Sequence, residues 1–554
     1  MTIRHSLVLE VSILILLSLI YFWACVPDLG YVAIHRDEAV VGNLGINLLK
    51  GQNLGYYNSI NINIFGKIFP INLFQEYTFA LPHYIVIPFF LLFGISIYSL
   101  KLAFIIVSYL GAIALYFLLR YIFDLKIALL TVLLLILSPS YVDFNRVSLK
   151  STEPLLNVLF WSGALFLVNY VRSKKSAYLY LAALLLGAGL SVKLSMVSRY
   201  IGLAVAVLAV YRVEARLIYE RLTARQLFLT AVYFCLGAIF FIYFNVSTKG
   251  STFALISDLL GNRSHWNYSS DNLNYLENIS TRVAQFSHLL KDNIFSIREN
   301  SGWVNIFKEC QFWVFWSSLA FGILLFFRRG DNSKVIFLCV LFVSMFATMI
   351  YSPSTWSYYH LPLMYPFPQL MIALFICKLY DLPEPIPFKA VKVVALTITL
   401  AVIICKTALL INYHNNYLGI SSRMFTSDES MEKLSEFINH NNLDPVFMFT
   451  DSLEERYVLH NKGSKTNNYI NEVWCLPALN EGLDRTFKKY RSIYVVCCVS
   501  KNDINYNMQC YSDWDNSKSD WLHLYVKQHK MRIEYFGCVK DKENMPLYEA
   551  FKVY

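Results

Sequence analysis

Charged side chains are scarce in this chain of 554 residues. They make up 16% of the sequence, whereas about 25% is usual for a soluble domain. Hydrophobic residues make up 56%, and the mean hydropathy is +0.44. Apolar runs long enough to cross about 30 Å of hydrocarbon recur along the first three-quarters of the sequence, and lipid offers no partners for backbone polar groups, so such runs must be helical. The shortage of charge excludes an ordinary soluble domain and predicts an all-α polytopic membrane protein.

Three further absences narrow the class of protein. The 11 cysteines lack metal-binding spacing, because Cys497 and Cys498 are adjacent rather than part of a C-x-x-C pair. The net charge of +10 comes largely from short basic clusters between apolar runs, so it is no nucleic-acid footprint. The first apolar run, 7–26, contains Glu10 and lacks a small-residue cleavage site, which indicates an uncleaved anchor rather than a signal peptide.

The apolar runs predict about eleven transmembrane helices. They cover 7–26, 97–119, 127–138, 154–171, 177–191, 196–211, 227–244, 312–327, 335–351, 361–377 and 391–412. Apart from Glu10, these spans carry little charge at mid-depth. Segment 81–94 is too short to cross, so we expect it to lie in the interface or to re-enter from the outer side.

Basic residues occur in alternate loops, and such loops stay in the cytoplasm. With the N-terminus inside, every basic cluster is cytoplasmic: Arg120/Lys126, Arg172/Lys174/Lys175, Arg212/Arg216/Arg221/Arg225, Arg328/Arg329/Lys334 and Lys378/Lys389/Lys392. The larger outer regions are then 27–80, 139–153, 246–310 and 420–554. We expect residues 1–419 to form the transmembrane domain, with a first outer loop that has interfacial helices over 27–96.

The pattern changes after residue 420 from continuous apolar runs to a mixture of helix and strand signals. Residues 427–440 alternate as an amphipathic helix does. Short apolar or alternating runs typical of strands occupy 445–450, 492–499, 532–539 and 548–554. The sequence therefore predicts a small extracytoplasmic α/β domain over 420–554.

Four ionisable residues, His35, Arg36, Asp37 and Glu38, follow the first predicted span without interruption. They fit a solvated loop, or a carboxylate held at the membrane surface as a general base or a cation ligand. Burial near lipid would raise the pKa of such a carboxyl group, and Arg36 would lower it. The residues alone leave both readings open.

Beginning at Asp37-Glu38-Ala39, a series of short motifs resembles a known family. The series continues through LGINLLKGQNLG (44–55), LPHYIVIPFFLLFGISIYSLKL (81–102), SPSYVDFNRVSLKSTEPLL (138–156), LLLGAGLSVKLSM (184–196) and YYHLPLMYPF (358–367). Their order is similar to that in GT-C glycosyltransferases, in the branch with protein O-mannosyltransferases, aminoarabinose transferases and RgtA-like lipopolysaccharide sugar transferases. Lys101 stands where this branch usually has arginine. The resemblance covers about residues 1–380.

The resemblance implies transfer of a sugar from a polyprenyl-phosphate donor to a glycan, lipid or protein acceptor on the outer face, usually with inversion. Asp37 matches the acid of the family's first loop and is expected to be the base or to orient the acceptor, with Glu38 in support. Glu76 is a second acid of this loop. One branch uses a comparably placed acid to hold a metal, so a divalent metal ion is compatible with the sequence but not required by it.

The leaving lipid phosphate needs positive charge, which Arg146 and Lys193 offer at outer span ends. Both residues also fit snorkelling side chains at the interface. Glu153 precedes Pro154, so it fits a helix N-terminus as well as the cavity-facing acid of the family. His360 lies at the outer mouth, where the family match favours contact with substrate or phosphate.

Two other functions remain open. A transporter or flippase would place ionisable residues at mid-membrane on broken helices, whereas the acids here gather at one face. A polymerase of lipid-linked glycans would use Arg and His in a large outer loop, and 246–310 offers Arg263, His265 and Arg282. The acidic pair Asp37-Glu38 favours the glycosyltransferase.

Overall fold

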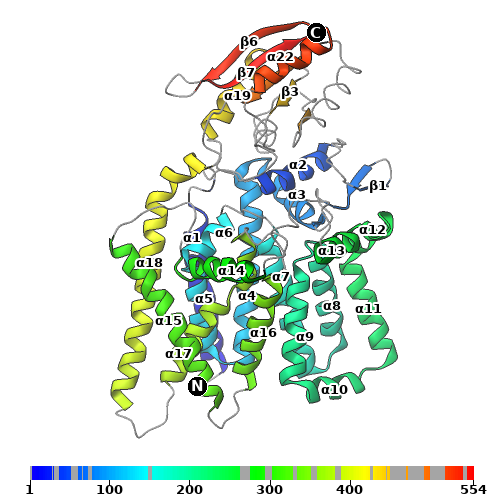
Figure 1. Cartoon of the computed structure of the whole chain (residues 1–554). Coiled ribbons are helices and arrows are strands. Elements are labelled where there is room, and N and C mark those ends of the chain that lie inside the picture. The colour runs from blue at the N-terminus through cyan, green and yellow to red at the C-terminus, as the bar shows by residue number, and fades with distance from the viewer. Residues whose placement is uncertain are drawn as a thin grey trace. The chain divides into compact units, whose positions relative to one another are not determined.

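A computed structural model of the chain gives its fold (Figure 1). It describes residues 3–27, 29, 36–50, 60–64, 67–72, 78–146, 152–261, 275–292, 302–327, 333–350, 358–380, 388–424, 428–443, 446–449, 470–471, 492–498, 518–540 and 546–554. The chain divides into two compact units. Residues 1–32, 44–94 and 98–420 form the first unit, and residues 33–43, 95–97 and 421–554 form the second.

The first unit is helical. Three of the helices belong partly to the second unit, namely α2 through residues 36–43, α4 through residue 97 and α18 through residues 421–424. The helices are α1 (Ile3–Cys25), α2 (Arg36–Lys50), α3 (Leu81–Phe93), α4 (Ile97–Ile122), α5 (Leu125–Ile136), α6 (Pro139–Arg146), α7 (Glu153–Ser173), α8 (Ser176–Leu190), α9 (Met196–Val210), α10 (Arg212–Glu220), α11 (Ala224–Gly237), α12 (Ile239–Ser247), α13 (Ser251–Gly261), α14 (Tyr275–Leu290), α15 (Gly302–Phe327), α16 (Ser333–Ile350), the 3-10 helix η3 (Tyr358–Met364), α17 (Phe367–Tyr380) and α18 (Phe388–Met424).

The helices confirm a multi-pass membrane protein but not the predicted count of about eleven spans. In the part of the chain that the structure describes, six segments are long and apolar enough to cross: Val8–Cys25, Ile97–Ile122, Glu153–Ser173, Ser333–Ile350, Leu361–Tyr380 and Lys392–Asn415. The bent pairs α5–α6 (61°) and α11–α12 (73°) raise the number to eight. Helices α8 and α9 have 15 residues each, or about 22 Å at 1.5 Å per residue, which is short of the hydrocarbon thickness.

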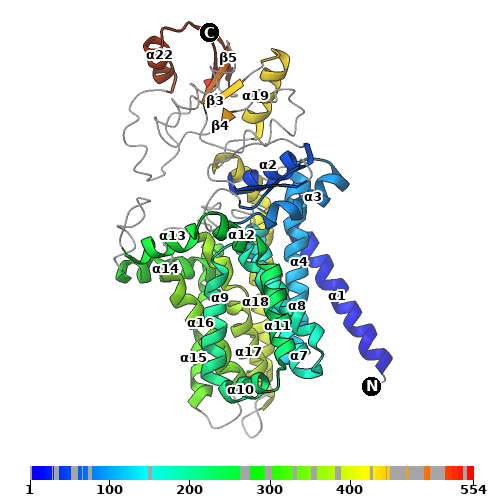
Figure 2. The ribbon, with the colours of Figure 1, turned by 90° about the vertical axis from the view of Figure 1, so that its right-hand side faces the viewer.

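Glycines let two of these helices approach closely. Helices α8 and α11 lie side by side, and α10 connects the C-terminal end of α9 with the N-terminal end of α11 (Figures 1 and 2). A Cβ atom built on Gly187 of α8 would lie 2.1 Å from the Phe234 carbonyl oxygen, and one built on Gly237 of α11 would lie 2.1 Å from that of Leu184. Small residues at such crossings are typical of membrane helix pairs, because association there depends on close packing.

The short helix α3, predicted as interfacial or re-entrant, has 13 residues and an exposed apolar end, with Leu91 and Leu92 both more than two-thirds exposed. Its His83 is fully buried, and burial lowers the pKa of this imidazole to about 3. His83 is therefore neutral at physiological pH. Ahead of α3, strands β1 (Asn61–Ile64) and β2 (Lys67–Pro70) pair as an antiparallel hairpin.

The second unit contains a five-stranded sheet in the order β4-β3-β5-β7-β6. The strands are β3 (Val446–Phe449), β4 (Ile470–Asn471), β5 (Ile493–Cys498), β6 (Ile533–Lys540) and β7 (Pro546–Val553). Strand β3 is parallel to β4 and β5, and β7 is antiparallel to β5 and β6.

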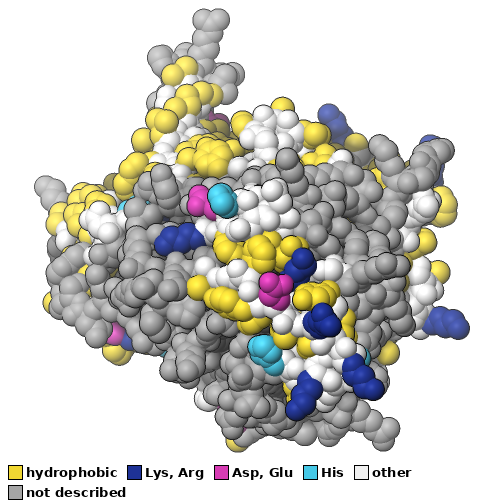
Figure 3. All heavy atoms as spheres, turned by 90° about the horizontal axis from the view of Figure 1, so that it is seen from above, with side chains coloured by type: hydrophobic (Ala, Val, Ile, Leu, Met, Phe, Trp, Pro, Cys, Tyr) yellow, Lys and Arg dark blue, Asp and Glu magenta, His cyan; other side chains and the backbone are white. Residues whose placement is uncertain are grey.

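The second unit also has helices α19 (Asp428–His440) and α22 (Lys518–Gln528). Leu434 and Ile438 of α19 and Leu522 of α22 are completely buried. Helix α19 and strands β3, β5, β6 and β7 lie within a few residues of the ranges that the sequence pattern predicts for them. The face drawn in Figure 3 carries Lys and Arg side chains among hydrophobic ones.

Candidate functional site

The end of the loop that precedes α3 is bound to the turn between α8 and α9. Thr78 forms an antiparallel bridge with Lys193, and the Phe79 amide donates to the Val192 carbonyl oxygen at 3.0 Å. Since Lys193 follows α8 by three residues, this bridge holds its backbone in place. The loop, α8 and α9 therefore jointly position a basic side chain that the sequence had singled out.

Lys193 forms an ion pair with Glu153 at the start of α7. Its Nζ atom lies 2.8 Å from Glu153 Oε1, and both side chains are at most 3% exposed. The Thr152 hydroxyl donates to the other carboxylate oxygen at 2.8 Å. A carboxylate in a first helical turn interacts favourably with the helix dipole, and Pro154 follows at a position that suits proline. Glu153 therefore occupies a helix N-terminus and also pairs with a buried cation, while its contact with substrate stays a prediction.

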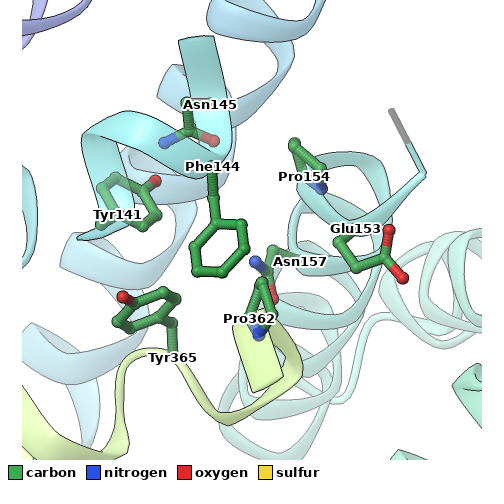
Figure 4. Close-up of a pocket in the computed structure, with 8 residues that line it drawn as sticks. All are labelled: Tyr141, Phe144, Asn145, Glu153, Pro154, Asn157, Pro362 and Tyr365. Atoms are coloured by element: carbon green, nitrogen blue, oxygen red, sulfur yellow. The ribbon is translucent and has the colours of Figure 1, made fainter. Parts of the chain in front are cut away.

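A small pocket lies beside this pair (Figure 4). Helix α6 contributes Tyr141, Phe144 and Asn145, α7 contributes Glu153, Pro154 and Asn157, and the segment around η3 contributes Pro362 and Tyr365. The lining therefore combines aromatic and proline side chains with two amides and one carboxylate. In Figure 4 the Glu153 carboxylate points away from Phe144, whereas the Asn157 amide nitrogen points toward it.

Arg199 of α9 forms hydrogen bonds with residues in and beside the pocket wall. It was not singled out in the sequence analysis. Its Nη1 donates to the Leu156 carbonyl oxygen at 2.9 Å, and its Nη2 donates to the Leu363 carbonyl oxygen at 3.1 Å and to Asn157 Oδ1. The guanidinium is fully buried, lies 5.0 Å from the Phe160 ring centroid, and interacts electrostatically with Glu153. One side chain thus connects α7, α9 and the η3 segment.

Arg146, a predicted phosphate ligand, is 1% exposed at the end of α6. Its Nη2 donates to the Pro27 carbonyl oxygen at 2.5 Å, and its Nη1 lies 3.0 Å from His414 Nδ1. The guanidinium also lies 5.5 Å from the Tyr413 ring centroid. The Tyr413 hydroxyl donates to Asp143 at 3.1 Å. These contacts fasten α6 to α18, and the predicted phosphate contact of Arg146 stays a prediction.

A second buried ion pair secures the beginning of α6. Lys406 of α18 lies 2.8 Å from Asp292 Oδ2 and donates to Gln311 at 2.8 Å. The Ser138 hydroxyl donates to Asp292 Oδ1 at 2.5 Å. Lys406 and Arg199 lie within apolar helices, and neither was singled out in the sequence. A basic residue inside an apolar helix was the available signal, because such residues face the protein interior.

The remaining predicted site residues are placed only in part. Asp37 and Glu38 lie in the first turn of α2, where Glu38 is fully buried; the Asp37 side chain lies outside the described residues. Glu76 also lies outside them, and His360 is placed in η3 by its backbone alone. Their roles stay predictions.

Two side chains of the alternative polymerase reading, Arg263 and His265, lie outside the described residues. The third, Arg282, is fully buried, and its Nε donates to the Met349 carbonyl oxygen at 3.2 Å. Among the residues that the structure places, no group of three or more His, Cys, Asp and Glu side chains could hold a metal ion. The suggested metal role of Glu76 is untested.

Comparison with known proteins identifies the fold. The family model "dolichyl-phosphate-mannose-protein mannosyltransferase" matches residues 80–248. The crystal structure of ArnT from Cupriavidus metallidurans bound to undecaprenyl phosphate is similar over 100% of this chain and 98% of its own, with a TM-score of 0.59 and 12% identity. Its apo state gives a TM-score of 0.57 at 11% identity, over 99% and 98% of the two chains.

A second enzyme with this likeness is the Archaeoglobus fulgidus oligosaccharyltransferase in complex with zinc and sulfate. The two chains are similar over 88% of this one and 68% of that one, with a TM-score of 0.52 and 11% identity. No curated protein sequence matches significantly. The chain therefore has the GT-C fold of membrane glycosyltransferases, as its motifs predicted.

Proposed function

We propose that the chain is a membrane glycosyltransferase that moves a hexosyl or pentosyl group from a polyprenyl-phosphate sugar to an acceptor on the extracytoplasmic face. The buried Glu153–Lys193 pair beside a pocket of aromatic rings and amides carries this proposal. It occurs on a fold that ArnT shares over its whole length, and the ArnT structure contains undecaprenyl phosphate. The family model supports the same reaction class.

The reaction exchanges one bond to the anomeric carbon for another. The acceptor oxygen attacks this carbon, the bond to the phosphate oxygen breaks, and the electron pair leaves with the lipid phosphate. A neutral hydroxyl is a poor nucleophile, so a base must take its proton. We assign that proton to Asp37, with Glu38 in support, and we expect inversion at the anomeric carbon.

Positive charge must meet the departing phosphate. We assign Lys193 to this task, because a buried ammonium group interacts with a phosphate far more strongly than one in water does. Arg146 and His360 are the further candidates, and Glu76 is the candidate for any divalent metal ion. Glu153 holds the Lys193 ammonium group in place by the 2.8 Å contact.

The acceptor is a glycan, a lipid or a protein, and residues 420–554 form an extracytoplasmic α/β domain that can select it. The N-terminus is cytoplasmic in this proposal. The basic clusters in alternate loops support that orientation.

The test is release of lipid phosphate from radiolabelled polyprenyl-phosphate sugars, supplied as a panel to purified protein in nanodiscs together with acceptor membranes. At least one donor should be turned over. At equal amounts of folded protein, Asp37→Asn should lose roughly 10²–10⁴-fold in rate, the usual contribution of a general base, and Glu38→Gln should lose less.

Glu214→Gln, in the exposed helix α10, serves as a matched control and should retain the wild-type rate. Absence of turnover with every donor would overturn the proposed function. Full activity of Asp37→Asn would leave the function standing and move the base to another acid.

A further inference from the structure

Helix α10 lies at the boundary of the hydrocarbon layer. It joins the C-terminal end of α9 to the N-terminal end of α11, and it runs crosswise to both helices in two views (Figures 1 and 2). Strongly exposed apolar side chains occur before it, at Leu208 of α9 (62%), and after it, at Phe228 near the start of α11 (67%). Because a helix rises 1.5 Å per residue, α10 begins only about 6 Å beyond apolar surface that lipid must cover.

Apolar side chains are also exposed on α10 itself, which has no buried residue. The helix packs against α9, and Ala215 and Ile218, which share one side of it, are half-buried. Val213 and Leu217 follow one another by one helical turn on another side and are 67% and 47% exposed. A helix with such an apolar stripe and arginines beside it is typical of segments that lie in the plane of the membrane interface.

Arginine outnumbers glutamate on α10 and around the turn after it: the arginines are Arg212, Arg216, Arg221 and Arg225, and the glutamates are Glu214 and Glu220. Arg216 forms an ion pair with Glu220 at 2.7 Å. The guanidinium groups of the other three arginines are exposed and form no hydrogen bond or ion pair with the residues that the structure describes. Arg212 and Arg225 each lie in the first turn of a helix, where the helix dipole disfavours a cation. Their charge is therefore not explained by helix stability.

We propose that α10 and the start of α11 form a binding surface for the headgroups of anionic phospholipids. Val213 and Leu217 enter the border of the acyl chains, and the unpaired arginines reach the phosphates, which a guanidinium matches by paired hydrogen bonds. The alternative is that the arginines only keep this loop on one side of the membrane. That role needs positive charge but no preference among lipids. The inference is independent of the proposed glycosyltransferase activity.

The experiment uses the full chain in phosphatidylcholine nanodiscs that contain a trace of a photoactivatable lipid. Phosphatidylglycerol and phosphatidylcholine with the same photoactivatable acyl chain are compared, and labelling is mapped by peptide. Each arginine near an anionic surface contributes about 5-fold in binding. Labelling of residues 212–228 by phosphatidylglycerol should therefore exceed that by phosphatidylcholine roughly 10-fold or more. Unlabelled phosphatidylglycerol should displace the label, and inorganic phosphate should not.

Variants locate the preference on this surface. Arg221→Gln/Arg225→Gln should reduce it by about 5-fold for each arginine, whereas Arg221→Lys/Arg225→Lys keeps the charge and should retain most of it. Lys174→Gln/Lys175→Gln is the matched control, because it removes two exposed positive charges from another basic loop, and it should leave the labelling of 212–228 unchanged. Leu217→Gln should lower labelling by both lipids.

Three results would overturn the inference. Equal labelling of 212–228 by the two lipids in the wild type would return the arginines to a role in topology. Displacement by inorganic phosphate would make this a site for a soluble anion rather than a lipid surface. An equal loss in the Lys174/Lys175 control would show a general effect of loop charge. The comparison of lipids in the wild type needs no variant, so it decides the question even where a variant fails to insert.

Discussion

Both oxygens of Glu153 are occupied, one by the Lys193 ammonium group and the other by the Thr152 hydroxyl. Taking two charges out of water is unfavourable unless each meets a partner of good geometry. The two residues are therefore interdependent. Removing one charge leaves the other buried without its direct partner, whereas removing both leaves neither of the two in that state.

This interdependence predicts the effect of Glu153→Gln on stability. We expect the free energy of unfolding to fall by about 3–5 kcal/mol, because the Lys193 ammonium group loses its buried counter-charge. The double variant Glu153→Gln/Lys193→Met should recover much of this loss, since the Lys193 charge is removed together with its direct partner, and only the electrostatic interaction of Glu153 with Arg199 is lost in both variants. Thermal unfolding of the single and the double variant in the same detergent measures both changes in stability. If single and double variants unfold alike, the pair does not stabilise the fold.

At this scale the sequence predicted single residues better than their partners. Glu153 and Lys193 were singled out by helix-end position and family motif, and the structure joins them across 40 residues. Arg199 and Asn157 were not singled out, because their meaning lies in a contact across 42 residues and in a third segment at Leu363. Such contacts depend on tertiary packing, which no local pattern encodes.

At the scale of the elements, hydropathy does not predict how closely two helices pack. The apolar character of α8 and α11 predicts two helices, but Gly187 and Gly237 decide the distance between them. Hydropathy also leaves the number of spans unconfirmed, because an apolar run predicts a helix without its tilt, its breaks or its length. The 73° bend between α11 and α12 lies within one predicted run, 227–244.

The close crossing predicts that Gly187→Ala destabilises the protein. The new methyl group would lie 2.1 Å from the Phe234 carbonyl oxygen, and backbone must move to admit it, so we expect a loss of about 1–3 kcal/mol. Gly189→Ala is the matched control on the same helix, because it meets the flexible Met196 side chain and should lose less. Thermal unfolding compares them. Equal stability of the two variants would contradict a close backbone contact at Gly187.

For the whole molecule, the order of short motifs predicted more than any single motif did. None of them is specific, yet their sequence along residues 1–380 identified the fold that ArnT shares over its entire length. The reason is physical: in a membrane, backbone polar groups must be paired within helices, so the arrangement of spans and loops is recorded in hydropathy and charge. The side-chain site, in contrast, depends on packing between distant segments.

Loop charge likewise predicts the orientation of the whole chain. Basic clusters alternate with the regions 27–80, 246–310 and 420–554, which places all three outside. Single epitope tags inserted at residue 265 or after Tyr554 should bind antibody on intact cells. A tag between Arg221 and Arg225, in a predicted cytoplasmic loop, should bind only after permeabilisation. Four spans are predicted between the tags at residue 265 and after Tyr554, so both tags must lie on the same side. A tag after Tyr554 that stays hidden while the tag at residue 265 is accessible would require an odd number of spans between them and would overturn the predicted topology.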